Sequence, residues 1–347
     1  MTIKKKLYPF TAIVGQEDMK KALLLNIINP LLGGVLIRGE KGTAKSTAVR
    51  AFAELLPDRE EVEGCRFGCD PNEISTYCED CYERYRKGEK LTVKIGSMKV
   101  IDLPVSATED RVVGTIDIEH AIKKGEKKFE PGILAMANRN ILYVDEVNLL
   151  DDHVVDILLD SAAMGINNIE REGISYVHPA IFILVGTMNP EEGDLRPQLL
   201  DRFGMVVDVV GEIDIDNRVE VIKRRIAYEE DSEAFALEWE ARQCELREKI
   251  LNAKRLLKNI RCPENMYDIA AKISIELGVD GHRADISMIK TAKTIAALNG
   301  EVEVNNEHMM EAASLVLPHR MRRRPFEEGI LDMAKIEELF RGMDDES

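Results

Sequence analysis

The chain has 347 residues, 45% of them hydrophobic, and its 47 basic and 63 acidic side chains give a formal net charge of −16 at pH 7. This length allows roughly two domains with a sizeable core, and the acidic excess argues against a general nucleic-acid surface, which would need a basic stripe. No apolar run reaches transmembrane length, and the basic residues 1–6 are not followed by the apolar segment of a signal peptide. We therefore expect a soluble, cytoplasmic protein without a membrane or a nucleic acid as its partner.

Hydrophobic periodicity predicts an α/β domain followed by a smaller all-α domain. Short apolar strands alternate with amphipathic helices over residues 33–210, which is typical of a parallel sheet with helices on both faces. Strands are expected near residues 34–38, 98–103, 140–145, 181–187 and 205–210. Helices are expected at residues 16–28, 214–228 and 232–257, with further helices over 263–341. We therefore assign residues 1–228 to the α/β domain and residues 229–347 to the all-α domain, which begins with a long linker helix.

A glycine-bearing loop with the sequence Gly-Glu-Lys-Gly-Thr-Ala-Lys-Ser joins the first expected strand to the next helix. This order of strand, loop and helix is that of a phosphate-binding loop, because backbone N–H groups and a helix N-terminus converge there and favour an anion. Ala44 stands where the motif usually has glycine, and its methyl group is tolerated if φ is negative. The correct flanks make a chance glycine-rich turn the weaker interpretation. The expected nucleotide-binding residues are Gly39, Gly42, Thr43, Ala44, Lys45, Ser46 and Thr47.

Two carboxylates end a later apolar run, residues 141–146, which has the pattern of a buried strand. We expect Asp145 to hold the Mg²⁺ of MgATP together with Ser46, while Lys45 reaches the β- and γ-phosphates. Glu146 would orient or deprotonate the attacking water. An apolar run ending in Asp-Glu is weakly specific alone, but after a phosphate-binding loop it favours a nucleotide hydrolase over a passive nucleotide binder.

Three further polar residues are candidates for the same chemistry. Asn189 follows an apolar strand and could hydrogen-bond the attacking water or the γ-phosphate, although an Asn-Pro turn is the simpler interpretation in isolation. Arg202 is either a solvated charge or a cation supplied to the nucleotide of a neighbouring subunit. Arg283 opens a helix of the all-α domain and could close over the nucleotide from above.

Taken together, these residues resemble the AAA+ ATPases, and more narrowly the magnesium chelatase ATPase subunit I family of the helix-2-insert, MoxR-related clade. The resemblance implies that Ile13 and Val14 contribute to the adenine pocket and that the all-α domain is a lid. It also implies that Asn189 is sensor 1, Arg202 the arginine finger and Arg283 sensor 2, in a hexameric ring. The strings that carry the resemblance lie at residues 8–17, 165–173, 189–198 and 317–323.

The family implies an ATP-hydrolysing motor that drives metal insertion into a tetrapyrrole by a partner catalytic subunit. Its partners would be a second AAA+ protein that carries a von Willebrand domain, and a large tetrapyrrole-binding chelatase subunit. The alternative is a MoxR-like chaperone that remodels another protein, and the net charge weighs against a third possibility, a DNA-translocating ring. The choice of inserted metal, Mg²⁺, Co²⁺ or another, would lie in the catalytic subunit.

Residues 104–130 match the position of the helix-2 insert of this clade. Gly114 lies between β-branched residues, which predicts a hairpin within residues 105–118, and residues 120–128 are helical in pattern and basic at their end. Such an insert would face a ring pore or a partner, or it is a solvated surface hairpin.

Four of the six cysteines lie in one loop, residues 64–90, as Cys65-x₃-Cys69 and Cys78-x₂-Cys81. This spacing in a cytosolic protein suggests a metal site, either zinc or an iron–sulfur cluster. A redox pair or reduced, unliganded thiols are the other possibilities, and the resemblance supports no metal here. Cys244 and Cys262 are isolated and expected to be inert.

Overall fold

The computed structural model describes residues 6–40, 45–116, 129–171, 174–279 and 281–321. Three residues expected to bind the nucleotide, Gly42, Thr43 and Ala44, lie outside this part of the chain, as does the helix expected at residues 120–128. None of the described helices combines the length and apolar character that a membrane span requires.

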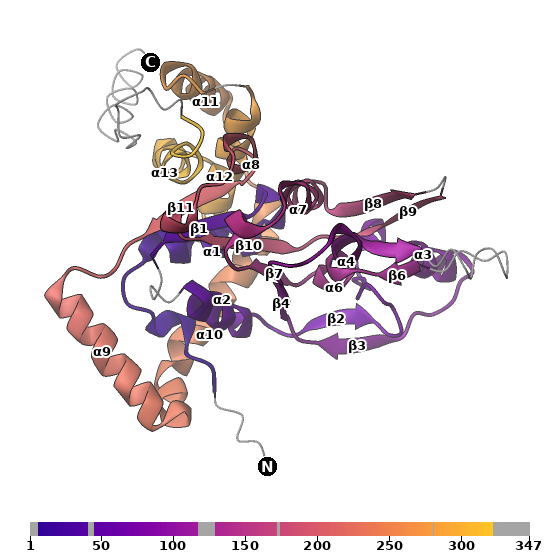
Figure 1. Cartoon of the computed structure of the whole chain (residues 1–347), viewed down its shortest axis with the longest axis horizontal. Helices are drawn as coiled ribbons and strands as arrows, with labels where there is room; N and C mark the ends of the chain where they lie inside the picture. Colours follow the sequence, from indigo (N-terminus) through magenta and orange to yellow (C-terminus); the bar gives the residue numbers. More distant parts are fainter. Residues whose placement is uncertain (1–5, 41–44, 117–128, 172–173, 280, 322–347) are drawn as a thin grey trace.

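Five parallel strands form the central sheet of the described structure, in the order β11-β1-β10-β7-β4 (Figure 1). In this order across the sheet, the strands span Met205–Val209, Val35–Gly39, Ile183–Met188, Ile141–Val144 and Val100–Leu103. The register pairs Val35 of β1 with Val185 of β10 on one side and with Met205 of β11 on the other. Each strand lies within about two residues of its expected position, so the predicted five-stranded parallel sheet is confirmed.

Each face of the sheet buries its own core, because successive side chains of a strand point to opposite faces. Along β1, Val35 and Ile37 join one core and Leu36 joins the other. The first core includes α1, α2 and the helices that follow the sheet along the chain, and the second includes α6, α7 and the cysteine-bearing loop. The helices α1, α2, α6 and α7 span Glu17–Ile28, Lys45–Leu55, Ile133–Ala137 and Asp152–Met164. Burial on both faces explains why the strands are almost entirely apolar.

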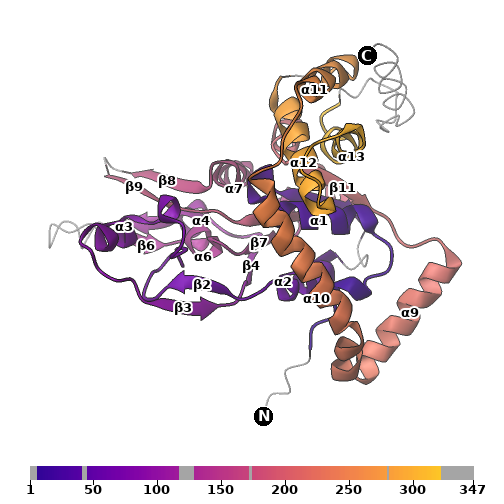
Figure 2. The ribbon, with the colours of Figure 1, turned by 180° about the vertical axis from the view of Figure 1, so that it is seen from behind.

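A helical extension follows the sheet. Helix α9, Ile215–Glu230, projects away from the sheet, and α10, Ser232–Leu257, runs back along the molecule to the last helices (Figure 2). The helices α11, α12 and α13 span Glu264–Glu276, Arg283–Asn299 and Asn306–Val316 and pack with α10 on the first core. The proposed domain boundary at residues 228 and 229 falls in the last turn of α9.

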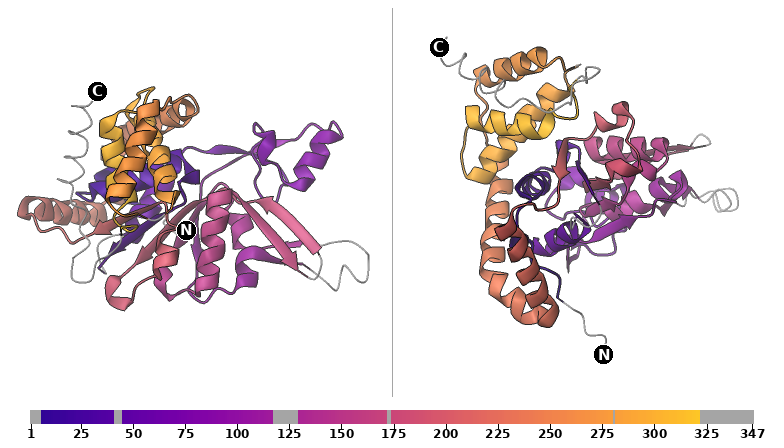
Figure 3. Two further views of the ribbon diagram at one scale, coloured as in Figure 1. Left: turned by 90° about the horizontal axis from the view of Figure 1, so that it is seen from above. Right: turned by 60° about the vertical axis from the view of Figure 1, so that its left-hand side comes forward.

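Among the described residues, three antiparallel strand pairs lie at the end of the molecule opposite α9 (Figure 3). The pair β2–β3 flanks the cysteine loop, and β8–β9 connects α7 to β10. The bounds of β2, β3, β8 and β9 are Arg59–Val62, Val93–Gly96, Ile166–Arg171 and Ile174–Pro179. Sequence patterns did not identify these two pairs, because their strands are short and partly polar.

The third pair corrects the prediction of a hairpin within residues 105–118. The structure instead has a short helix α4, Glu109–Val113, followed by β5, Gly114–Ile116, which pairs with the distant β6, Phe129–Pro131. Gly114 adopts φ +100° where α4 ends, and a side chain there would collide with the backbone of Glu130. The glycine therefore allows a helix-to-strand junction and a close strand approach rather than a tight turn.

Candidate nucleotide site and four-cysteine cluster

The residues of the expected phosphate site meet where β1, β7 and β10 end. Gly39 closes β1, and a side chain there would collide with the carbonyl oxygen of Val209 in β11, so this position requires glycine. Lys45 begins α2, and its Nζ donates hydrogen bonds to the carbonyl oxygens of Gly39 and Glu40. Burial lowers the pKa of Lys45, while the nearby carboxylates of Asp145, Glu146 and Glu192 act in the opposite direction. The ammonium group therefore faces the carboxylates that were expected to handle Mg²⁺ and water.

Asp145 is held by two hydroxyl groups. Thr187 of β10 donates to Oδ1 of Asp145 at 2.5 Å, and the hydroxyl of Tyr143 donates to the same oxygen at 3.0 Å. Burial raises the pKa of Tyr143, and its hydrogen bonds with Thr187 and Ser46 oppose that shift. Ser46 and Asp145, the two expected ligands of the Mg²⁺, thus contact the same tyrosine.

Glu146 adopts a left-handed backbone conformation with φ 53°, which few non-glycine residues occupy and which carries some strain. Its backbone N–H donates to the hydroxyl of Thr187 at 3.3 Å. Thr187 therefore contacts both residues of the Asp-Glu pair, a positioning role that no sequence motif indicated.

A cavity of about 350 Å³ lies beside the phosphate site and could hold a nucleoside. Three expected residues, Ile13, Val14 and Thr47, line it. The lining also includes three residues of the exposed helix α9, which sequence reasoning missed because α9 carries no recognisable motif: Arg218, Val221 and Arg225. Among the described residues that line this cavity, none comes from helices α11 to α13.

Asn189 lies directly after β10 and is buried. Its Oδ1 accepts the backbone N–H of Glu191 at 3.2 Å, so the side chain caps the short helical turn Pro190–Glu192. The Asn-Pro turn is therefore present, and the side-chain oxygen of Asn189 is engaged in it.

Neither candidate arginine is among the described residues that line the base cavity. Arg202 forms ion pairs of 2.9 Å with both Asp156 and Asp160 of α7. Arg283, at the start of α12, forms an ion pair of 2.7 Å with Asp201, the residue before Arg202. Arg283 therefore contacts the residue that precedes Arg202 in the chain, and its role as sensor 2 stays a prediction.

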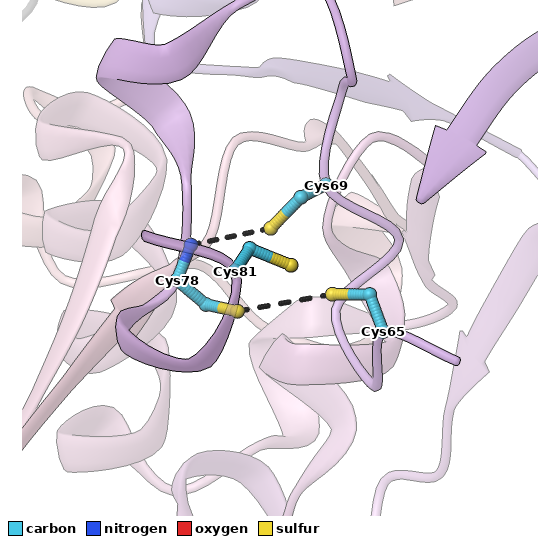
Figure 4. Close-up of side chains that lie close together, drawn as sticks. All are labelled: Cys65, Cys69, Cys78 and Cys81. Atoms are coloured by element: carbon cyan, nitrogen blue, oxygen red, sulfur yellow. Dashed lines mark hydrogen bonds between the residues drawn. The ribbon is translucent and has the colours of Figure 1, made fainter. Parts of the chain in front are cut away.

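The four clustered cysteines converge on one point (Figure 4). Their Sγ atoms all lie within 4.8 Å of one another, and Cys65 and Cys78 are separated by 3.8 Å. Cys69, Cys78 and Cys81 are buried, and Cys65 is half-buried. Hydrogen bonding with Cys69, and then with Cys78 and Cys81, lowers the pKa of Cys65. Four convergent, mostly buried thiols have the composition of a metal centre.

Known protein families match both parts of the chain. The family described as AAA domain (dynein-related subfamily) matches residues 89–203, and the AAA lid domain family matches residues 268–339. A putative ATPase from Cytophaga hutchinsonii has the same fold, with a TM-score of 0.61 at 20% identity over 95% of this chain and 90% of that one. The fold and the site define an AAA+ ATPase.

Similar proteins identify the family of AAA+ ATPases to which the chain belongs. A magnesium-chelatase subunit ChlI homolog from Methanocaldococcus jannaschii is 59% identical, and the alignment covers 98% of this chain and 92% of that protein. The magnesium-chelatase 38 kDa subunit of Acidiphilium rubrum is 49% identical over 93% of this chain and 94% of that protein. The solved complex between subunits BchI and BchD of magnesium chelatase includes a chain with 47% identity and a TM-score of 0.55, covering 96% of this chain and 98% of that one. The chain belongs to the magnesium-chelatase subunit I family.

Proposed function

We propose that this chain binds MgATP at the carboxyl ends of β1, β7 and β10 and hydrolyses it to drive metal insertion by a partner catalytic subunit. The observation that carries the proposal is the convergence of Lys45, Ser46, Asp145 and Glu146 beside the cavity lined by Ile13. Lysine would neutralise the phosphates, Ser46 and Asp145 would hold Mg²⁺, and Glu146 would activate water. The loop between β1 and α2, with Gly42, Thr43 and Ala44, would supply backbone N–H groups to the phosphates.

Hydrolysis requires a ring in this proposal, because neither candidate arginine lines the cavity of its own subunit. Arg202 is held by Asp156 and Asp160, and Arg283 is held by Asp201, the residue before Arg202. Both arginines would act on the nucleotide of the neighbouring subunit. Asn189 would contact the γ-phosphate or water from within the same subunit. This arrangement supports the hexameric assembly implied by the family.

The named relatives favour a chelatase motor over the chaperone alternative. One solved relative is in a complex of subunits BchI and BchD of magnesium chelatase, and this supports a BchD-like partner here. We propose a large tetrapyrrole-binding subunit as the second partner, because the described residues of this chain place no histidine–carboxylate cluster at the nucleotide site. In addition to MgATP, we propose that the chain binds a structural Zn²⁺ at the four cysteines, which form a separate site.

The proposal is tested by measuring nucleotide binding, turnover and metal insertion separately. Glu146→Gln should bind ATP within about threefold of the wild type but lose turnover, since it keeps the shape and removes the base. Lys45→Ala should lose both ATP binding and ATP turnover. Lys223→Ala on α9 is a matched control that should change neither. The intact chain should insert metal into a porphyrin only after the BchD-like partner and the large subunit are added. Equal ATP hydrolysis by wild type and Lys45→Ala, or metal insertion by the isolated chain, would overturn the proposal.

A further inference from the structure

The geometry of the cysteine cluster matches a single tetrahedral ion. Zinc–sulfur bonds of about 2.3 Å place the sulfurs of a regular tetrahedron about 3.8 Å apart. The Sγ atoms of Cys65 and Cys78 are 3.8 Å apart, and all four sulfurs lie within 4.8 Å of one another. A disulfide would bring two sulfurs into bonding contact, and an iron–sulfur cluster would spread four thiolates over several iron atoms. The observed spacing favours one ion at the centre of four thiolates.

Two backbone N–H groups donate to sulfurs of the cluster. The N–H of Phe67 donates to Sγ of Cys65 at 3.4 Å, and the N–H of Cys78 donates to Sγ of Cys69 at 3.2 Å. Gly68 adopts φ +58°, which turns the chain between the first two cysteines so that both sulfurs face inward. Such N–H···S contacts surround the sulfurs of metal sites and stabilise their negative charge.

The segment that carries the cysteines has almost no apolar core of its own. Helix α3, Glu79–Arg86, buries only Cys81 among its residues, and the short helical turn Ile74–Thr76 buries none. Tyr82 and Tyr85 of α3 are exposed. Without an ion, little besides the four thiols would hold this helix in place, whereas a structural zinc site contributes folding free energy directly.

The same segment is fastened to the residues that lead into β7. The side chain of Asn138 donates to the carbonyl oxygen of Phe67 at 2.8 Å. Arg139 donates to the carbonyl oxygens of Glu60 and Gly68 and forms an ion pair of 2.7 Å with Asp70. These contacts lie at the amino end of β7, whereas Asp145 follows its carboxyl end. The cluster and the nucleotide site therefore occupy opposite ends of one buried strand.

The cysteine-bearing segment also packs against two strand pairs, β5–β6 and β8–β9. Phe67 stacks on His178 of β9 with ring centroids 4.8 Å apart, and His178 packs on Phe129 of β6 at 5.6 Å. Phe129 in turn stacks on Tyr176 of β9 at 4.3 Å, and Arg66 donates to the carbonyl oxygen of Phe129. The aromatic column thus begins between the first two cysteines and joins β5–β6 to β8–β9.

We propose that the four cysteines hold one structural Zn²⁺, and that this zinc-centred loop braces both strand pairs against the segment leading into β7. The inference goes beyond the proposed function and does not rest on it. The metal fixes Phe67, Phe67 fixes His178, and His178 in turn contacts Phe129. Asn138 and Arg139 anchor the loop to the sheet. The ion takes no part in ATP chemistry, because it lies at the other end of β7.

The metal is tested on untagged full-length protein by elemental analysis. We expect one zinc and no iron per chain in the wild type and in Cys244→Ser, the matched control, and less than about 0.1 zinc in Cys81→Ser. If Cys81→Ser does not fold, release of zinc from the wild type by a mercurial thiol reagent, followed with a zinc-binding dye, gives the same count. A well-folded wild type without metal, iron with acid-labile sulfide, or a Cys65–Cys78 disulfide would overturn the site.

The brace is tested with Phe67→Leu, which keeps all four cysteines. Zinc content should stay at one per chain, while amide hydrogen exchange in residues 129–131 and 174–179 should accelerate about tenfold or more. Tyr82→Leu, an exposed aromatic of the same loop, is the matched control and should leave this exchange unchanged. Unchanged exchange in Phe67→Leu with zinc retained would overturn the brace. MgATP affinity should stay within about twofold in both variants. If the wild type does not bind ATP, the proposed function is wrong, whereas the conclusion about zinc is unaffected.

Discussion

Thr187→Val tests how the ends of β7 and β10 hold the catalytic carboxylates. Thr187 is buried, donates to Asp145 at 2.5 Å and accepts the N–H of Glu146 at 3.3 Å. Valine fills nearly the same space but can make neither hydrogen bond. A hydrogen bond to a charged group contributes about 1.5–3 kcal/mol. Because Asp145 is exposed and Tyr143 provides a second donor, we expect the lower end, about 1.5 kcal/mol, which corresponds to roughly a tenfold loss of kcat.

The assay is steady-state ATP hydrolysis by the assembled ring, with Mg²⁺ varied at fixed ATP. Thr187→Val should lower kcat about tenfold and require more Mg²⁺, since both Asp145 and the strained Glu146 lose a partner. Thr187→Ser keeps the hydroxyl and should remain within about threefold of the wild type. A Thr187→Val enzyme with wild-type kcat and Mg²⁺ dependence would refute this reasoning, as would equal losses in the serine and valine variants.

Three other outcomes are expected. Arg202→Ala should lower the rate of ATP hydrolysis about 10³-fold. Mixing it with Lys45→Ala subunits should restore part of this rate, because some subunit interfaces would combine an intact phosphate-binding loop with an intact arginine. If mixing restores no activity, Arg202 does not act between subunits. Burial lowers the pKa of His178 below 6.5, so the folded state keeps it neutral. Titration of His178 should therefore leave the free energy of unfolding unchanged above about pH 7 and lower it by up to about 1.4 kcal/mol per pH unit below pH 6.5. Urea titrations above pH 7 and below pH 6.5 measure this free energy. If His178→Gln shows the same dependence of the unfolding free energy on pH as the wild type, the reasoning is wrong. Gly39→Ala should cost about 1–3 kcal/mol of stability through its collision with β11, whereas Gly211→Ala, with open space around it, should cost little in the same thermal melts.

The sheet and the positions of Lys45 and Asp145 at its edge were predictable because their signals are local. Apolar runs buried on both faces marked all five strands, and Lys45 and Asp145 each follow or end such a run. Parallel strands bring their carboxyl ends to one edge, so residues far apart in the chain had to meet there. The same logic explains why Asn189, after β10, lies at that edge.

The base cavity, the position of Arg283 and the chemistry of the cysteine cluster depend on tertiary contacts, which sequence spacing does not predict. Helix α9 contributes Arg218, Val221 and Arg225 to the base cavity, but its residues are mostly exposed and show no motif. The position of Arg283 depends on how the last helices pack on α1 and β11, which is a matter of tertiary contacts between distant segments. Cysteine spacing alone left four chemistries open, because only the three-dimensional convergence of the sulfurs distinguishes one ion from a cluster or a disulfide.

Strand β7 provides a physical route between the two ends of the molecule. It lies inside the sheet between β10 and β4 and is buried on both faces, so it can shift only as a unit with its neighbours. A displacement of Asp145 on ATP hydrolysis would therefore reach Asn138 and Arg139, which hold the cysteine loop. If the proposed Zn²⁺ fastens this loop, the strand pairs would follow as a rigid body instead of unfolding locally. Coupling of this kind requires two discrete arrangements, and we expect hydrogen exchange at residues 129–131 to differ between ADP and a non-hydrolysable ATP analogue. Identical exchange in both nucleotide states would exclude β7 as the route.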